Sequence, residues 1–295
     1  MVILVQALFS GLAQGCVYAL IALGYSVIYS TLKMGHFAQG DFYMLGAFIG
    51  LNLAAAFGLP GVLVFMGAAL LTSAVMLILE YAAYRPMYNG PPLALLICTL
   101  GMQYVVQEIA KTLWGSDVRR FPPLFANTVY YVSFLGDRIA ISMQNVWVIT
   151  VCIALMAALV LFMGKTKTGI AMGAVSMNRK AAALMGVKIS TIIRSTYIIA
   201  AALAAVAGVL MGPLYSVSFS MGGITGNKAM TAAIMGGFGS LSGAIVGGVL
   251  LGIVETLGAL YLSSAYKDVF SFVILILILF CRPQGILGQA SITKV

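Results

Sequence analysis

Side chains that could take part in chemistry are scarce in this sequence, and the ones that stand out interrupt long apolar stretches. Glu255 lies well inside the stretch 243–262, and His36, Gln39 and Asp41 cluster where another stretch begins. If these stretches cross a membrane, a charged group inside one costs about 2.5–3.5 kcal/mol or more, so such a group needs a role. Glu255 suits either the passage of a polar solute or an ion pair between helices, and both interpretations stay open. A proton relay would need a chain of such groups across the membrane, which the sequence does not supply.

The cluster at His36 has a counterpart in the second half of the chain. The segments YSTLKMGHFAQGDFYMLGAF (29–48) and YSVSFSMGGITGNKAMTAAIMGGF (215–238) share a Tyr-Ser start, a Gly-rich break, polar residues and a short helix with Met and Gly that ends in Phe. Interrupted helices on opposite membrane faces line the transport path in inverted-repeat transporters; chance similarity is the alternative. The candidates for such a path are His36, Gln39, Asp41, Asn227, Gly239 and Glu255. The alternative for His36 and Asp41 is a helix start close to the inner face, where the helix dipole favours Asp41.

The sequence contains no motif that indicates nucleotide binding, metal binding or catalysis. MGKTKTG (163–169) contains Gly-Lys-Thr, but a phosphate-binding loop needs a glycine where this chain has Leu159, and GGFGSLSG (236–243) lacks the GxGxxG spacing. Four cysteines lie in apolar stretches without metal spacing, and we expect small buried hydrophobes there: Cys16, Cys98, Cys152 and Cys281. No carboxylate clamp such as a buried arginine is evident. The sequence predicts no catalytic residue, no metal site and no ATPase site, so ATP-driven work would come from a partner.

The elements that must position these residues are membrane helices. The chain is 62% hydrophobic and 8% charged, whereas a soluble domain has about 25% charged residues. A net charge of +9 does not indicate nucleic acid, because the basic residues lie between apolar stretches without aromatic interleaving. No Lys or Arg precedes Lys33, and the first apolar stretch is longer than a signal sequence needs, so we expect it to be retained as a helix.

Nine apolar segments are predicted, two of them short. They lie at roughly 5–30, 36–57, 60–83, 92–113, 145–163, 192–212, 228–239, 243–262 and 268–281. The predicted fold class is an all-α polytopic membrane protein of about eight to ten transmembrane helices. It would have a two-fold internal pseudo-repeat, with one short or interrupted helix per half. We expect a single domain, 1–295, with halves of about 1–143 and 144–295.

The distribution of Lys and Arg predicts the orientation of the chain. When the loop 165–191 lies in the cytoplasm, the inner side carries the larger share of the basic residues. The amino terminus is then periplasmic and the carboxy terminus cytoplasmic. The longest outer segment, 115–143, contains TVYYVSFLGDRIAIS, which predicts a small β-hairpin about a Leu-Gly-Asp turn.

The loop 165–191 is expected to hold a short helix. Asn178 or Ser176 can cap it, RKAAALM has high helix propensity, and Gly186 suits a left-handed end. Such a helix is too short to be stable alone in water and needs something to pack on. A basic connector that only obeys the charge rule is the alternative, but it would not explain the Ala-rich core.

Small residues recur at four-residue spacing, which lets helix backbones approach closely in lipid. The pairs are Gly11 with Gly15, Gly46 with Gly50 and Gly208 with Gly212, followed by a dense run from Gly236 to Gly252. We interpret them as internal packing. For the dense run, a path-lining helix or a contact between subunits is the alternative.

Several motifs, in order, resemble the branched-chain amino acid permease family of ABC importers. They are YALIALGYSVIY, GHFAQGDFYMLGAF, RKAAALMGV, MGGFGSLSGAIVGGVLLGIVE and RPQGILG, spread over most of the chain. The resemblance implies a permease of a bacterial inner membrane that pairs with a second, related permease. It also implies two cytoplasmic ATPases, which use ATP and Mg, and a periplasmic solute-binding protein. No cofactor is expected in this chain itself.

The resemblance also implies a coupling helix that docks on the ATPase. Lys180, Ala181, Ala182 and Gly186 match the family's EAA-like pattern, with Lys180 where Glu is common. The segment 178–188 thus supplies the predicted coupling residues: Asn178, Arg179, Lys180, Ala181, Ala182, Leu184, Met185, Gly186 and Lys188. Alternatives are the same importer class with another solute (urea, an amide or an aromatic acid), a secondary transporter or channel acting alone, and a membrane scaffold that transports nothing.

Overall fold

A computed structural model describes residues 2–88, 90–124, 128–134 and 137–288. The helices are α1 (Val2–Leu32), α2 (Gln39–Phe57), α3 (Gly61–Leu79), α4 (Pro92–Trp114), α5 (Met143–Lys165), α6 (Lys167–Met177), α7 (Arg179–Leu184), α8 (Ile189–Tyr215), α9 (Met221–Gly236), α10 (Leu241–Tyr261) and α11 (Lys267–Cys281). A π-helical turn, Glu80–Tyr84, extends α3, and 3₁₀ turns lie at Arg85–Met87 and Ser264–Tyr266. Two strands, β1 (Val129–Phe134) and β2 (Asp137–Ser142), pair antiparallel.

The all-α membrane fold is confirmed. Seven of the described helices are long and apolar enough to cross a membrane, and α9 and α11, with 16 and 15 residues, are the two short segments among the nine predicted. The bounds of α9 are a correction: it covers 221–236 and not 228–239. Its first turns are rich in Gly, so hydropathy alone places the start too late. The division into halves at 143/144 stays a prediction.

Close backbone contacts hold the centre of the bundle together. A Cβ on Gly15 of α1 would lie 2.9 Å from the Cα of Val249 in α10, and a Cβ on Gly46 of α2 would overlap Ala205 of α8. Gly248 and Gly252 face α1 in the same way. For these glycines the prediction of internal packing is confirmed, because side chains would hold the helices apart.

The two interrupted segments meet inside the bundle. A Cβ on Gly40, at the start of α2, would lie 2.6 Å from the Cα of Gly226 in α9. Gln39 donates a 2.8 Å hydrogen bond to the carbonyl of Ala200, the twelfth of the 27 residues of α8. The start of α2 therefore lies near the middle of a long helix. The expectation that this cluster lies close to the inner face is wrong, because residues 33–38 lead the chain back into the bundle after α1 ends.

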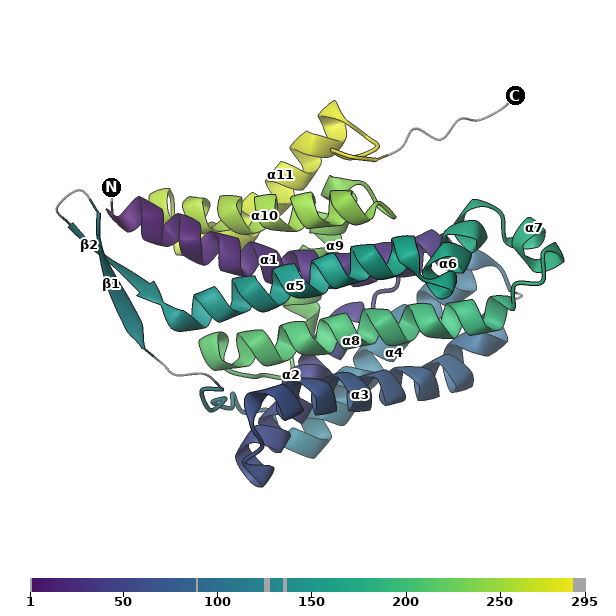
Figure 1. Cartoon of the computed structure of the whole chain (residues 1–295), viewed down its shortest axis with the longest axis horizontal. Coiled ribbons are helices and arrows are strands. Elements are labelled where there is room, and N and C mark those ends of the chain that lie inside the picture. The colour runs from purple at the N-terminus through teal and green to yellow at the C-terminus, as the bar shows by residue number, and fades with distance from the viewer. Residues whose placement is uncertain (1, 89, 125–127, 135–136, 289–295) are drawn as a thin grey trace.

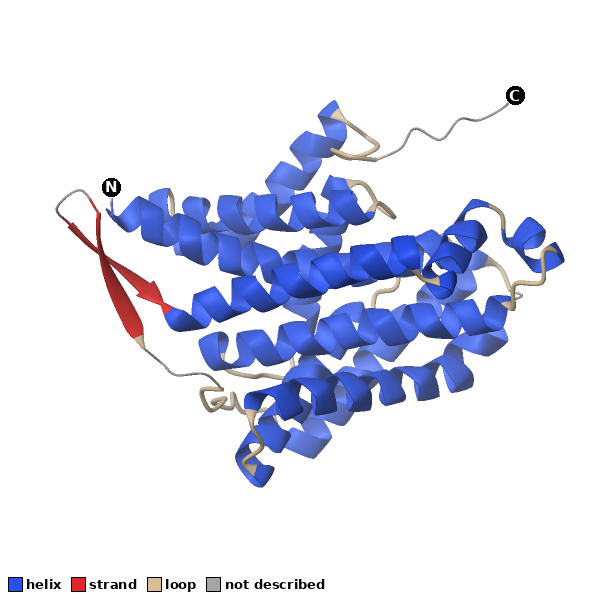
Figure 2. Ribbon diagram, in the orientation of Figure 1, coloured by secondary structure: helices blue, strands red, loops and turns tan. Residues whose placement is uncertain are grey.

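The two ends of the bundle carry different structures (Figure 1). The amino terminus and the hairpin β1–β2 lie at one end, and α6 and α7 at the other. The hairpin prediction is confirmed for both strands, while Leu135 and Gly136 of the predicted turn lie outside the described residues. Figure 2 shows how completely helices dominate the rest of the chain.

The loop 165–191 contains more helix than predicted. Besides α7 it holds α6, whose start is capped by the Thr166 hydroxyl accepting from the Gly169 amide at 3.0 Å. Met172 and Val175 of α6 form a small core with Ala182 of α7 and Ile192 of α8. The short helix α7 therefore packs on its own chain along one side.

Candidate functional site

A buried ionic network links α9, α10 and α11. The ammonium of Lys228 lies 2.5 Å from Glu255 and 2.6 Å from Asp268. Lys267 makes a longer contact of 3.4 Å with Glu255. Glu255 is fully buried and Lys228 is 6% exposed, whereas the Asp268 side chain is largely exposed. Pairing offsets the cost of placing charge in the bundle, so the ion-pair interpretation of Glu255 holds in the structure.

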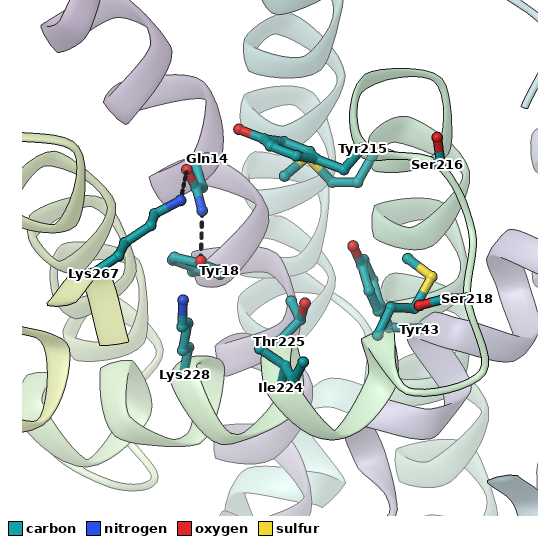
Figure 3. Close-up of a pocket in the computed structure, with 12 residues that line it drawn as sticks. Gln14, Tyr18, Tyr43, Tyr215, Ser216, Ser218, Ile224, Thr225, Lys228 and Lys267 are labelled. Carbon is teal, nitrogen blue, oxygen red and sulfur yellow. Dashed lines mark hydrogen bonds between the residues drawn. The ribbon is translucent and has the colours of Figure 1, made fainter. Parts of the chain in front are cut away.

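A cavity of about 220 Å³ lies directly beside this network. We call it the lysine cavity. Its polar lining comes from Gln14 and Tyr18 of α1, Tyr43 of α2, Tyr215 of α8, Lys228 of α9 and Lys267 of α11 (Figure 3). Ser216, Ser218 and Thr225 add hydroxyls, and Met211, Met221 and Ile224 add apolar surface. Lys267 donates to Gln14 Oε1 at 3.3 Å, and Gln14 Nε2 donates to the Tyr18 hydroxyl at 2.6 Å. Polar groups from five helices thus converge on one space.

The path candidates identified from the sequence do not include Lys228 or Lys267, the two lysines of this cavity, and the sequence alone shows no carboxylate clamp. The structure instead buries Lys228 at the eighth residue of α9. The signal that could have found it is the isolated Glu255 in another apolar stretch, since each buried charge requires an opposite partner.

His36, Gln39 and Asp41 lie between helices and line neither of the cavities described here. The His36 ring is 2% exposed and packs edge-on against Tyr84 and Tyr197, with ring centroids 5.1 and 5.4 Å away. Neither of its ring nitrogens has a hydrogen-bond partner among the described residues. This environment favours a neutral imidazole held by aromatic packing.

Asp41 lies where α2 and α9 begin. Its Oδ1 accepts a 2.8 Å hydrogen bond from Gln107 of α4, and a Cβ on Gly222 would lie 2.8 Å from the same oxygen. The carboxylate is buried in the first turn of α2, the position that the helix dipole favours. Its contacts connect α2, α4 and α9. Asp41 therefore joins the starts of the two interrupted helices, α2 and α9.

Asn227 and Gly239 do not line the lysine cavity. Asn227 is exposed on the surface of α9, next to the buried Lys228. Gly239 has a φ of +91° in the turn between α9 and α10 and lines a second cavity of about 790 Å³ near the end of α1. A Cβ on Gly239 would lie 3.0 Å from the Tyr29 ring, so the turn needs glycine for both conformation and space. The six candidates therefore do not converge on one lumen within this subunit.

The predicted coupling residues form one local structure. The Asn178 side chain caps α7 by accepting from the Ala181 amide at 3.0 Å, and Gly186 ends the turn with a φ of +85°, so both local predictions are confirmed. Ala182 is buried, whereas Arg179, Lys180 and Lys188 are exposed. Lys180 has no ion-pair partner among the described residues.

Apolar side chains project from this structure. Leu184 is 89% exposed and Met185 is 85% exposed, and Met177, at the end of α6, is 91% exposed. They lie at the end of the bundle opposite the amino terminus (Figure 1). Three exposed apolar side chains around one short helix are typical of a protein contact surface.

No metal centre emerges from the part of the chain that the structure describes: no group of three or more His, Cys, Asp or Glu side chains there could hold an ion. The four cysteines are unpaired; Cys16 and Cys152 are buried, Cys98 is half-buried, and Cys281 is exposed, which corrects the expectation that all four are buried.

Comparison with known proteins gives a consistent result. Residues 7–279 match the family described as branched-chain amino acid transport system / permease component. The chain is 38% identical over 301 residues to the high-affinity branched-chain amino acid transport system permease protein LivH of Escherichia coli (strain K12), covering 98% of this chain and 97% of that protein. It is 39% identical over 299 residues to the corresponding protein BraD of Pseudomonas aeruginosa, with the same coverage.

A solved structure is similar in fold at a much lower sequence identity. A chain of PsaBC from Streptococcus pneumoniae, solved in complex with Fab, aligns with a TM-score of 0.50 at 14% identity, over 93% of this chain and 91% of that one. At this identity the likeness concerns the fold alone. On the family match and the full-length relatives, this chain belongs to the branched-chain amino acid permease family.

Proposed function

We propose that this chain is the permease subunit of an ATP-driven importer for branched-chain amino acids. It works with a second, related permease, two cytoplasmic ATPases that use ATP and Mg, and a periplasmic solute-binding protein. The assembly lies in a bacterial inner membrane, with the amino terminus of this chain periplasmic and its carboxy terminus cytoplasmic. Relatives named as branched-chain amino acid permeases match nearly the whole chain, and this supports branched-chain amino acids as the solute.

The observation that carries the coupling step is the exposed apolar surface of the segment 178–188. Leu184 and Met185 project from a helix that is capped at Asn178 and seated on α6 and α8 through Ala182. A groove on an ATPase that covers these side chains would bury apolar area that is otherwise in water. Movement of the ATPases then reaches the permease as displacement of α7.

The packing suggests how that displacement travels onward. Ile192, near the start of α8, shares the small core with α7, and Ala200, two turns later, holds Gln39 at the start of α2. Because α2 and α9 contact each other through Gly40 and Gly226, a shift of α8 also reaches α9. Alternating access is then a rocking of these interrupted helices against those of the second permease.

Gly186 provides the test. A Cβ there would meet nothing within 4 Å, so a substitution acts through the positive φ and not through a clash. The left-handed conformation costs an L-residue roughly 1–2 kcal/mol, so we expect Gly186→Val to shift the end of α7 and reduce leucine uptake about tenfold. Gly186→Asn is the matched control, because Asn tolerates this conformation and should retain most uptake.

Both variants are assayed for radiolabelled leucine uptake in cells, for the amount of chain in the membrane, and for ATP hydrolysis by the purified assembly. The proposal requires that Gly186→Val remains in the membrane and that the assembly still hydrolyses ATP while its leucine uptake falls about tenfold. Normal uptake by Gly186→Val would contradict the coupling role. Leucine transport by the purified chain alone, without ATP, would instead favour a secondary transporter or channel.

A further inference from the structure

We propose that the lysine cavity is a transient binding site for the solute inside the permease, and that it selects an α-amino carboxylate with an aliphatic side chain. This inference rests on the importer function proposed above and adds a site to it. The cavity is lined by residues at the end of α8 and the start of α11, and by Tyr18 and Lys228, which lie about halfway along α1 and α9.

Lys267 is the group that would hold the carboxylate of the solute. Lys228 is already engaged by two short ion pairs, 2.5 Å to Glu255 and 2.6 Å to Asp268. In the part of the chain that the structure describes, the contacts of Lys267 are long, 3.4 Å to Glu255 and 3.3 Å to Gln14. A solute carboxylate can replace these weak contacts without breaking the stronger ones.

The charge balance of the network favours a zwitterion. Two lysines, Lys228 and Lys267, face two carboxylates, Glu255 and Asp268, so the network is neutral without a ligand. A zwitterion enters without adding net charge, whereas an anion or a cation would leave one charge without a partner at membrane depth. Hydroxyl oxygens on the opposite wall, from Tyr43 and Thr225, and Gln14 Oε1 can accept from the ammonium group (Figure 3).

The remaining wall suits an aliphatic side chain. Met211, Met221 and Ile224 supply its apolar surface, and methionine side chains adapt to hydrophobic groups of different shape. The volume of about 220 Å³ is below the range of about 300–1,000 Å³ that is typical of drug-sized ligands. A single amino acid of the leucine, isoleucine and valine type fits these dimensions and chemistry.

The test is binding of tritiated leucine to the purified complex of both permeases and the ATPases, in detergent and without the solute-binding protein. We expect saturable binding to the wild-type complex and competition by valine. Leucinamide, which lacks the carboxylate, should compete about tenfold less well or worse, because it cannot pair with Lys267. Lys267→Gln should weaken binding by a similar factor, and Lys267→Arg should retain it.

A second variant tests the cavity without changing its charges. Thr225→Trp fills the space between Tyr43 and Lys228 and should abolish both binding and ATP-driven uptake. Ile276→Trp is the matched control: Ile276 lies on α11 and is 66% exposed, so the same large side chain is added away from the cavity. We expect the control to bind and import leucine as the wild type does.

The outcomes separate this inference from the function on which it rests. If the wild-type assembly imports leucine with ATP, but the complex binds none and Thr225→Trp imports normally, the cavity is not a solute site and the importer function stands. If leucinamide competes as well as leucine does, the proposed role of the carboxylate is wrong. If the wild-type assembly with its solute-binding protein imports no branched-chain amino acid, the importer function itself fails.

Discussion

At the scale of single residues, the network around Lys228 explains how a short polar helix is retained inside an apolar bundle. Its ammonium connects α9 to Glu255 on α10 and to Asp268 on α11. These contacts come from segments 27 and 40 residues further along the chain, as the numbering shows. A polar group in lipid that lacks such partners would favour a different helix position.

Replacing one member of this network should lower the free energy of unfolding strongly. Replacing two paired members together should lower it less. Glu255→Met removes the fully buried partner and should lower the free energy of unfolding by about 3–5 kcal/mol, because the Lys228 charge is left partly uncompensated. The double variant Lys228→Met with Glu255→Met should recover more than half of that loss. Thermal unfolding of the purified complex in detergent measures both.

Glu108→Gln serves as the reference for this comparison. Glu108 pairs with Lys111 at 3.5 Å, as the i,i+3 spacing predicts, but both side chains are substantially exposed. Removing it should change stability by only about 0–1 kcal/mol. Equal melting temperatures for Glu255→Met and Glu108→Gln would show that the buried network contributes nothing to stability.

At the scale of helices, the four-residue spacing of glycines has a direct structural consequence. Gly11 and Gly15 of α1 meet Gly248 and Gly252 of α10, where the two helix backbones touch. Packing contacts of this kind drive helix association in lipid, where the hydrophobic effect between helices is absent. The α1–α10 pair also places Gln14 and Tyr18 in the lining of the lysine cavity and Glu255 against the two lysines that line it.

A pair of alanine substitutions tests this contact. Gly252→Ala places a Cβ onto the backbone of Gly15 and should destabilise the bundle by about 1–3 kcal/mol, as overpacking does elsewhere. Gly101→Ala on α4 meets nothing within 4 Å and should be neutral or slightly stabilising. The comparison is made by thermal unfolding in detergent, and a neutral Gly252→Ala would mean that α1 and α10 do not touch there.

At the scale of the whole molecule, the distribution of charge predicts how the bundle sits in the membrane. The exposed basic residues Arg179, Lys180 and Lys188 surround α7 at one end, and the hairpin β1–β2 lies at the other. Basic segments between helices remain on the cytoplasmic side. We therefore expect the hairpin, and with it the end of α8 that lines the lysine cavity, to face the periplasm.

Reporter fusions measure this orientation. Alkaline phosphatase, which is active only in the periplasm, should be inactive when fused after Lys180 and active when fused after Gly115. A cytoplasmic reporter such as β-galactosidase should give the opposite pattern. Phosphatase activity at Lys180 would reverse the orientation and remove α7 from contact with cytoplasmic ATPases.

The sequence by itself determined the fold class, the approximate position of nine apolar segments, the hairpin, the cap at Asn178 and the left-handed end at Gly186. Each of these depends on hydropathy, propensity or turn chemistry within a few neighbouring residues. The motif order was also sufficient to indicate the permease family. Only the tertiary structure decided that His36 is packed among aromatic rings in the bundle and that Lys228 meets Glu255 and Asp268. Those contacts join residues that are distant in the chain, and they depend on where residues 33–38 and α9 turn inside the bundle, which local sequence patterns do not specify.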